Sequence, residues 1–230
     1  MNDEKLIEIK ELAKTYRQNG IVVHALDSIN LTVQKGEFAA IVGPSGSGKT
    51  TLLNMIGILD TPSRGGIRLL QQSVAEMTSS EKAKFRRDRI GFIFQSFNLI
   101  PVLSVSENIE YVMQLQRIPA RERKKRIESI LEDLGLANMQ KRLPRQLSGG
   151  EQQRVAIARA MLAEPSIILA DEPTANIDSR TGENLIDLMY KLNKEKGTTF
   201  LFSTHDRMIK EHAKRVIQLR DGRIEYDEKQ

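Results

Sequence analysis

The stretch GPSGSGKT, residues 43–50, constrains the fold of this 230-residue chain more than any other segment. It follows the short apolar run EFAAIVG, residues 37–43, and opens the expected helix TTLLNMIGILD, residues 50–60. Its glycines let the backbone curl until several N–H groups point at one anion, and the start of the helix adds partial positive charge. The pattern G-x-x-x-x-G-K-[ST] between a strand and a helix therefore predicts a phosphate-binding loop for a nucleoside triphosphate.

This loop supplies most of the candidate nucleotide ligands. Lys49 can reach the β- and γ-phosphates, and the Thr50 hydroxyl can ligate Mg²⁺. A chance Gly/Ser turn is the alternative, and the order strand, loop, helix argues against it. The remaining nucleotide-binding candidates in this segment are Gly43, Ser45, Gly46, Ser47, Gly48 and Thr51.

Two carboxylates follow the apolar run IILA, residues 167–170. Such a continuous run is typical of a strand buried on both faces in a parallel sheet, and ligands of open α/β sheets bind at the carboxyl ends of the strands. Because an unpaired buried carboxylate is costly, we expect Asp171 to hold Mg²⁺ and Glu172 to orient or deprotonate a water molecule. An acidic helix cap before Pro173 is the alternative. The pair favours hydrolysis over transfer to a small acceptor.

Composition excludes several other classes of protein. The chain contains no Cys, which rules out disulfides and Cys-based metal sites. The net charge is +5, but basic and acidic residues alternate in segments such as ARERKKRIESILEDLG, residues 120–135, as on a solvated helix face. Motifs that read nucleic acid are absent, and without Trp a base-stacking platform is not expected.

The remaining pattern is that of an alternating β/α chain with a helical insertion. Residues 104–141 have helical periodicity and few strand formers, which predicts an insertion of about 50 residues. A hairpin is expected over residues 215–227, with Asp221-Gly222 as its turn. Further helices are expected at 79–88 and 180–195. Strands are expected at 6–16, 24–33, 37–43, 65–70, 90–95, 166–172 and 198–204.

The segment LSGGEQQR, residues 147–154, begins another helix in an unusual way. Ser148 and Glu151 fit the S-x-x-E capping box, which explains the helix start. The two following glycines each cost about 1 kcal/mol relative to Ala in a helix. A pair without Cβ atoms leaves the N–H groups of the first turn open to an anion, although the phosphate loop already provides one such cradle.

With LSGGEQQR about 100 residues after the phosphate loop and about 20 before Asp171, the whole chain resembles the ATP-binding subunits of ABC (ATP-binding cassette) systems. The resemblance implies ATP hydrolysis, with Glu172, His205 and Lys49 as catalytic residues. Tyr16 matches the aromatic residue that stacks on adenine, and Gln95 matches the residue that ligates Mg²⁺ and senses the γ-phosphate. The metal set is thus Thr50, Gln95 and Asp171.

The resemblance also implies an α/β P-loop NTPase fold: a RecA-like core sheet, an N-terminal antiparallel β subdomain and a helical insertion subdomain. We expect one ABC ATPase domain over residues 1–230. About 1–95 and 163–230 would form the catalytic core with its β subdomain. About 96–162 would form the helical subdomain, which includes LSGGEQQR.

A second copy of the chain is part of what the resemblance implies. In a head-to-tail dimer, two ATP molecules lie between the phosphate loop of one copy and Ser148, Gly149 and Gly150 of the other. Asp178 matches a loop that contacts the partner copy. ATP-driven closure of the dimer would then act as a conformational switch.

Softer motifs resemble the lipoprotein-release and macrolide-export branch (LolD/MacB type), with the FtsE group nearby. They are LNMIGILDTPSRGGIRL, FQSFNLIPVLSVSENIEYV and DEPTANID, although SRG replaces the usual TSG after Pro62. The branch implies an integral membrane permease as partner and a cytoplasmic position on the inner face of the membrane. The permease could dock on an apolar patch, or these residues could pack inside the insertion: Phe97, Leu99, Ile100, Pro101 and Leu103.

Two other functions stay open from the sequence. One is mechanotransmission without transport, as in the FtsE group. The other is a soluble ABC ATPase acting on DNA or ribosomes, but such proteins usually carry two cassettes or a long coiled-coil insertion, and the chain has neither.

Overall fold

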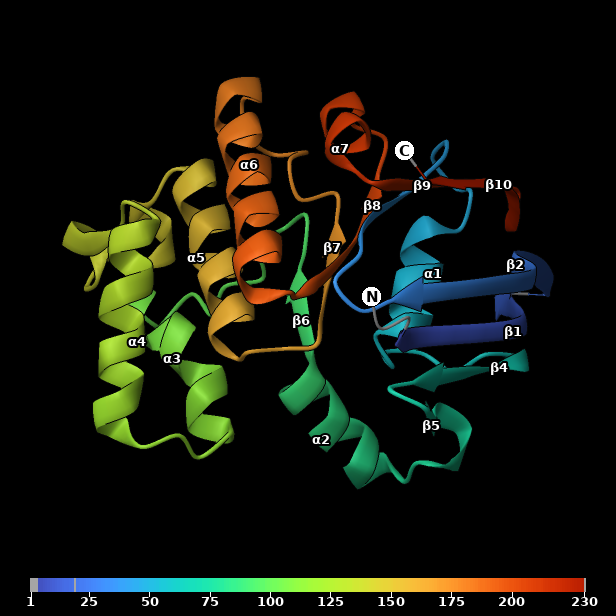
Figure 1. Cartoon of the computed structure of the whole chain (residues 1–230), viewed down its shortest axis with the longest axis horizontal. Coiled ribbons are helices and arrows are strands. Elements are labelled where there is room, and N and C mark those ends of the chain that lie inside the picture. The colour runs from blue at the N-terminus through green and yellow to red at the C-terminus, as the bar shows by residue number, and fades with distance from the viewer. Residues whose placement is uncertain (1–3, 19, 230) are drawn as a thin grey trace.

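The computed structural model describes residues 4–18 and 20–229 and contains two sheets (Figure 1). The larger sheet has the strand order β10–β9–β3–β8–β7–β6, in which all neighbours pair parallel except the terminal hairpin of β9 and β10. Its strands are β3 (Phe38–Val42), β6 (Ile90–Ile93), β7 (Ile167–Asp171), β8 (Thr199–Thr204), β9 (Arg215–Arg220) and β10 (Arg223–Lys229). Every residue of β3 and β8 is buried, which explains the continuous apolar sequence of β3 and the apolar run FLF, residues 200–202, within β8.

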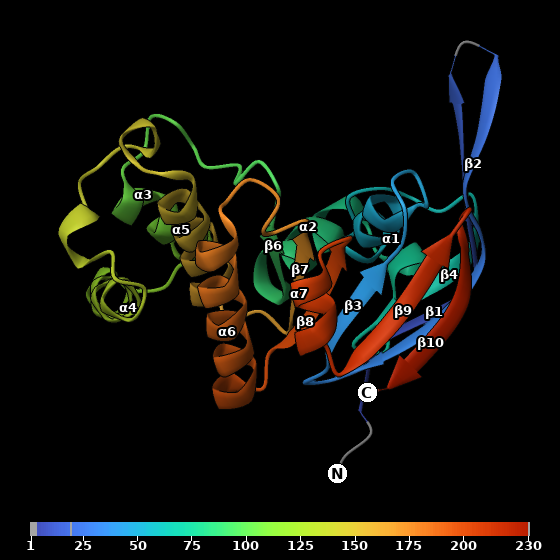
Figure 2. The ribbon, with the colours of Figure 1, turned by 90° about the horizontal axis from the view of Figure 1, so that it is seen from above.

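The smaller sheet is antiparallel, with the order β2–β1–β4–β5. The hairpin of its two long strands projects well beyond the rest of the molecule (Figure 2). The sheet consists of β1 (Lys5–Gln18), β2 (Ile21–Gln34), β4 (Arg64–Leu69) and β5 (Gln72–Ser73). Apolar residues of this sheet, of α1 (Lys49–Ile56) and of one face of the larger sheet form a single core.

The opposite face of the larger sheet packs against α6 (Ser179–Lys196) and α7 (Arg207–His212). A third apolar cluster lies within the helical segment, between α3 (Val105–Leu115), α4 (Ala120–Asp133) and α5 (Gly149–Leu162). This segment occupies the end of the molecule away from the antiparallel sheet (Figure 1). The remaining elements are α2 (Ser79–Arg89) and three short 3₁₀ turns, η1 (Val74–Glu76), η2 (Ala137–Met139) and η3 (Pro144–Gln146).

The fold class expected from the sequence is confirmed, and the differences are local. The helix expected over residues 50–60 ends at Ile56, because Gly57 caps it. A Cβ on Gly57 would lie 2.6 Å from the ring of Phe92, so glycine is required where α1 meets β6. The strand expected over 90–95 ends at Ile93, which leaves Gln95 in a loop. β5 and α7 are short elements that the sequence pattern did not indicate.

One buried ion cluster ties the two sheets together. The Arg215 guanidinium donates to Asp227 at 2.6 Å, to Glu37 at 2.8 Å and to the carbonyl oxygen of Thr32 at 2.7 Å. Arg215 is only 9% exposed, and the hydrogen bonds to Asp227 raise the pKa of its guanidinium further. The cluster joins β2, the start of β3 and the terminal hairpin, so its loss affects contacts between three parts of the chain.

We expect Arg215→Gln to lower the free energy of unfolding by about 3 kcal/mol, because Glu37 would keep a buried carboxylate without its charged partner. Urea unfolding monitored by circular dichroism measures the change. The matched control is Arg220→Gln on the same strand, since Arg220 is largely exposed and its ion pairs lie at the surface. Equal stabilities of the two variants would contradict the assigned role of the cluster.

Candidate active site

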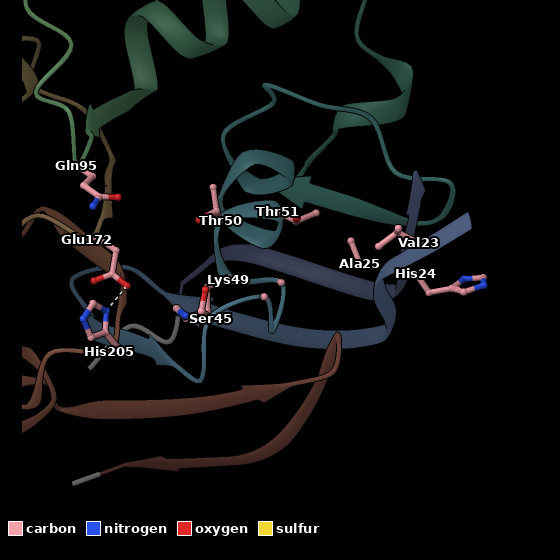
Figure 3. A pocket seen from close by; sticks show the side chains of 12 residues that line it. Val23, His24, Ala25, Ser45, Lys49, Thr50, Thr51, Gln95, Glu172 and His205 are labelled. Carbon is pink, nitrogen blue, oxygen red and sulfur yellow. Dashed lines mark hydrogen bonds and ion pairs between the residues drawn. The ribbon is translucent and has the colours of Figure 1, made fainter. Parts of the chain in front are cut away.

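A cavity of about 600 Å³ opens at the carboxyl ends of the parallel strands (Figure 3). Its wall combines the loop after β3, the start of α1, and single residues that follow β6, β7 and β8. The lining residues predicted from the sequence are Ser45, Gly46, Gly48, Lys49, Thr50, Thr51, Gln95, Glu172 and His205. The cavity therefore gathers segments that are far apart in the chain.

The phosphate loop is shaped by contacts with its own chain. A Cβ on Gly43 would collide with the carbonyl oxygen of Leu219 in β9. Gly48 has φ of 102°, which disfavours other residues, and a Cβ there would lie 2.5 Å from the carbonyl oxygen of Ala25. The Ser47 hydroxyl is buried and has no hydrogen-bond partner among the residues that the structure describes. These glycines hold the loop close to β2 and β9 and leave its cavity side open.

Lys49 is a buried cation beside this cavity. Its side chain is largely enclosed, and Nζ donates to the carbonyl oxygens of Gly43 at 2.9 Å and Pro44 at 3.0 Å. It forms no ion pair with any carboxylate in residues 4–18 and 20–229. A buried ammonium group whose partners are neutral carbonyls fits a site for an anion, such as the phosphates of a nucleotide.

Oxygen donors for a magnesium ion lie at the same edge of the sheet. The Thr50 hydroxyl donates to Asp171 Oδ1 at 3.1 Å, and the Gln95 side chain lines the cavity from the other side (Figure 3). No group of three acidic, His or Cys ligands occurs in the described part of the chain. This set fits Mg²⁺, which usually takes one or two carboxylates and completes its shell with water and substrate phosphates.

Glu172 is held in a strained conformation at the end of β7. Its φ is +45°, a left-handed conformation that costs roughly 1–3 kcal/mol for a residue other than glycine. Its N–H donates to the Ser203 carbonyl oxygen at 2.8 Å. Its Oε1 lies 2.8 Å from His205 Nδ1, and Oε2 accepts from the Thr204 hydroxyl at 3.3 Å. The carboxylate thus points into the cavity beside an exposed imidazole (Figure 3).

Tyr16 lies on β1 and is not among the lining residues of the cavity. Its hydroxyl donates to Asp60 at 2.9 Å, and Lys14 Nζ lies 4.8 Å from the ring centroid. Burial, followed by the hydrogen bond to Asp60, raises the pKa of Tyr16. Tyr16 pairs with Val23 across the hairpin, and Val23 does line the cavity.

The β2 wall of the cavity was not predicted from the sequence. It consists of Val23, His24 and Ala25, which carry no motif. His24 pairs through Nδ1 with the Thr15 hydroxyl at 3.2 Å. Only the register of β1 and β2 brings these residues to the phosphate loop, and a single sequence does not reveal that register.

The LSGGEQQR segment forms the start of α5 and lies outside the cavity. Glu151 N donates to Ser148 Oγ at 3.3 Å and Ser148 N donates to Glu151 Oε2 at 2.6 Å, as the capping box predicts. The backbone N–H of Ser148 contributes most to the lowered pKa of Glu151. Ser148, Gly149 and Gly150 line no part of the cavity around Lys49.

The two glycines also have a role within their own chain, which the sequence did not indicate. A Cβ on Gly149 would lie 3.0 Å from the carbonyl oxygen of Asn176, and one on Gly150 would lie 2.5 Å from Thr181 Cγ2. The glycines therefore allow α5 to approach the loop after β7 and the start of α6. Asp178 caps α6 by accepting from Thr181 N at 3.0 Å, and hydrogen bonding with the Thr181 side chain, followed by that with its N–H, lowers the pKa of Asp178.

Comparison with known proteins agrees with this geometry. The family model described as ABC transporter matches residues 26–175. An uncharacterized ABC transporter ATP-binding protein of Methanocaldococcus jannaschii, MJ0796, is 45% identical over 228 residues, covering 97% of each chain. The macrolide export ATP-binding/permease protein MacB of Sodalis glossinidius is 44% identical over 222 residues; the match covers 96% of this chain and 34% of MacB, so the chain spans about a third of that relative.

A solved structure extends the likeness to three dimensions. The dimeric structure of a post-hydrolysis state of the ATP-binding cassette MJ0796 bound to ADP and Pi has a TM-score of 0.90 and 44% identity, covering 97% of this chain and 98% of that one. The sequence match, the shared fold and the cavity with its phosphate loop lead to one conclusion. The chain belongs to the ABC transporter family, as an ATP-hydrolysing ATP-binding domain.

Proposed function

We propose that this chain powers a membrane-embedded ABC export or extraction complex of the lipoprotein-release or macrolide-efflux type. The name of the MacB relative joins an ATP-binding part to a permease part, and this chain matches about a third of that protein. None of the helices in residues 4–18 and 20–229 is long and apolar enough to cross a membrane. An integral membrane permease would hold the chain at the inner face of the cell membrane.

Bound ATP would supply the scissile phosphate bond, and Mg²⁺ would neutralise negative charge on its phosphate groups. Lys49 and the loop N–H groups would hold the β- and γ-phosphates, while Thr50, Gln95 and Asp171 would hold the metal. Tyr16, next to the β2 wall, would stack on the adenine ring. Two buried groups support this assignment. The Ser47 hydroxyl has no hydrogen-bond partner among the described residues, and the Lys49 ammonium group donates only to neutral carbonyl oxygens.

Glu172 is proposed as the general base. Its carboxylate would take the proton of the attacking water molecule, and His205, 2.8 Å away, would orient that carboxylate and approach the γ-phosphate. The strained φ of Glu172 fixes its direction toward the cavity. Both residues follow adjacent parallel strands, which keeps their geometry independent of flexible loops.

A second copy of the chain would complete the site, and one observation carries this proposal. The cavity around Lys49 is lined by residues of the phosphate loop and by Gln95, Glu172 and His205, whereas the start of α5, with Ser148, Gly149 and Gly150, lies outside it. A helix N-terminus with glycines in its first turn favours an anion. We infer a head-to-tail dimer in which these residues, with Asp178 nearby, reach the ATP of the other copy.

An apolar groove of about 410 Å³ between β6, α3 and α5 is the proposed docking surface for the permease. Its lining includes the exposed side chains of Tyr111 and Leu115 from α3 and the rings of Phe92 and Phe94. The groove adjoins the loop that carries Gln95, so a helix bound there could sense the state of the cavity.

The apolar segment that follows Gln95 has a mixed environment in the structure. Ile100 lines the groove, while Leu99 packs against the core of the helical segment. Val102 is 78% exposed, and Phe97 and Leu103 are half-buried. The half-buried Arg159 guanidinium, whose pKa is lowered by desolvation, fixes the segment by donating to two of its carbonyl oxygens. Leu99 therefore packs inside the insertion, and docking of a permease next to Ile100 is our proposal.

Glu172→Gln is expected to slow ATP hydrolysis by roughly 10²- to 10⁴-fold, because the general base is lost while its shape remains. ATP binding should persist, so the variant should accumulate as a dimer in saturating ATP-Mg²⁺. Analytical ultracentrifugation and phosphate release measure the two effects. Glu211→Gln, an exposed carboxylate on α7, is the control and should behave like the wild type. A Glu172→Gln protein that remains monomeric would contradict the proposed dimer.

The absence of native cysteines allows a direct test of the head-to-tail arrangement. Ser45→Cys and Ser148→Cys are made separately, each together with Glu172→Gln. In ATP-Mg²⁺, a short bismaleimide should link the two proteins when they are mixed, because the phosphate loop of one faces the α5 start of the other. Neither variant alone should form a linked dimer on a denaturing gel. Linking within either single variant and not in the mixture would refute this arrangement.

Leu115→Asp is expected to abolish recovery of the chain with cell membranes, since a charge in the apolar groove opposes docking of a permease helix. ATP hydrolysis by the isolated protein should remain unchanged, because Leu115 does not line the catalytic cavity. Membrane sedimentation of tagged chain in the cells of origin measures the effect. Lys124→Asp on the exposed face of α4 is the control. Unchanged membrane recovery of Leu115→Asp would exclude this groove as the docking site.

A further inference from the structure

A buried amide links α5 to the loop that carries Glu172. Gln153 is fully buried, and its Nε2 donates to the carbonyl oxygen of Pro173 at 2.6 Å. Pro173 directly follows Glu172 in the chain, whereas Gln153 lies 20 residues earlier, on the helix that begins at Ser148. The contact therefore connects two parts of the proposed mechanism. The start of α5 is proposed to bind the ATP of the second copy, and Glu172 is proposed to act on the ATP bound by its own chain.

Gln153 is a costly choice if it serves only packing. The Oε1 atom of its amide is buried and has no hydrogen-bond partner among the described residues. A buried polar atom without a partner lowers stability, and an apolar side chain of the same length would avoid that loss. The one bond that the amide makes, to the residue after Glu172, is thus the feature that distinguishes Gln from Met at this position.

The loop after β7 is tethered at two further points. The Thr174 hydroxyl donates to Asp206 Oδ2 at 2.7 Å, and Asn176 Nδ2 donates to the Gln95 carbonyl oxygen at 2.8 Å. A left-handed backbone such as that of Glu172 persists only where the surrounding structure fixes it. Of these three side-chain tethers, the one from Gln153 lies nearest along the chain to Glu172, whose own N–H donates to the Ser203 carbonyl oxygen.

We propose that Gln153 is a positioning residue for Glu172. Its amide holds the Pro173 carbonyl and thereby keeps the strained Glu172 backbone, and with it the carboxylate, directed at the attacking water molecule. The inference rests on the proposed role of Glu172 as general base. It also means that a displacement of the α5 start, where Ser148 would contact the second copy's ATP, is transmitted to the carboxylate of the same chain.

Gln153→Met tests the proposal, because Met keeps the length of the side chain and removes the donor. The expected kcat for ATP hydrolysis falls by roughly tenfold to a hundredfold, the loss typical of a misplaced catalytic group. The KM for ATP and the Kd of a fluorescent ATP analogue should remain at wild-type values. The thermal midpoint should fall modestly, because the buried Pro173 carbonyl oxygen loses its donor while the unpartnered Oε1 atom disappears.

Asn193→Leu is the matched control. Asn193 is also a buried amide, and its Nδ2 donates to the carbonyl oxygens of Gly36 and Thr198 at 3.0 and 2.8 Å, remote from the cavity. Its loss should lower the thermal midpoint and leave kcat unchanged. A lowered kcat in Gln153→Met at unchanged ATP affinity, against an unchanged kcat in Asn193→Leu, is the result that a merely structural role does not produce.

A wild-type kcat in Gln153→Met overturns the inference, and so does a loss of kcat that is matched by an equal loss of ATP affinity. If Gln153→Met does not fold, Gln153→Leu is measured in the same way. Glu172→Gln separates the two levels of the proposal: a fully active Glu172→Gln protein refutes the proposed base itself. In that background, adding Gln153→Met should slow the residual hydrolysis no further, because both changes act on one carboxylate.

Discussion

The parallel pairing of β3, β8, β7 and β6 is the constraint on which the site depends. Val42 pairs with Thr204, Asp171 pairs with Ser203, and Ile93 pairs with Ala170, so the four strands finish within about a residue of each other. Parallel strands that end together present their following loops at one edge. The phosphate loop, Gln95, Glu172 and His205 meet there because each follows the carboxyl end of one of these strands.

The site concentrates features that oppose stability. It contains a left-handed Glu172, a buried Lys49 ammonium group without a carboxylate partner, and a Ser47 hydroxyl without any partner in the described part of the chain. Such features persist because the cores on both faces of the larger sheet hold the backbone in place. The same pattern extends to Gln153, which keeps one amide atom unpartnered beside the loop of Glu172.

How much could be predicted from the sequence differed from residue to residue. The phosphate loop, the carboxylates after β7 and the capping box of Ser148 depend on local spacing, so a single sequence reveals them. The β2 wall depends on the pairing of β1 and β2, and the fit of Gly149 against Asn176 depends on how α5 packs on a loop that comes later in the chain. Neither the strand pairing nor this packing contact produces a periodic pattern of apolar residues in the sequence. Gln153 lies within α5 and belongs to no motif that the sequence analysis used, so only its contact with Pro173 indicates a role.

The Arg215 cluster and the strand order of the larger sheet determine how late in synthesis this sheet can form. β3 leaves the ribosome early, yet both of its sheet neighbours, β8 and β9, are made only after residue 198. The partners of Arg215 are likewise divided between Thr32, Glu37 and Asp227. Pairing over such sequence distances is slow and leaves unpaired edges exposed in the meantime. A nascent chain of this protein therefore carries its phosphate loop for most of its synthesis without the sheet that shapes it.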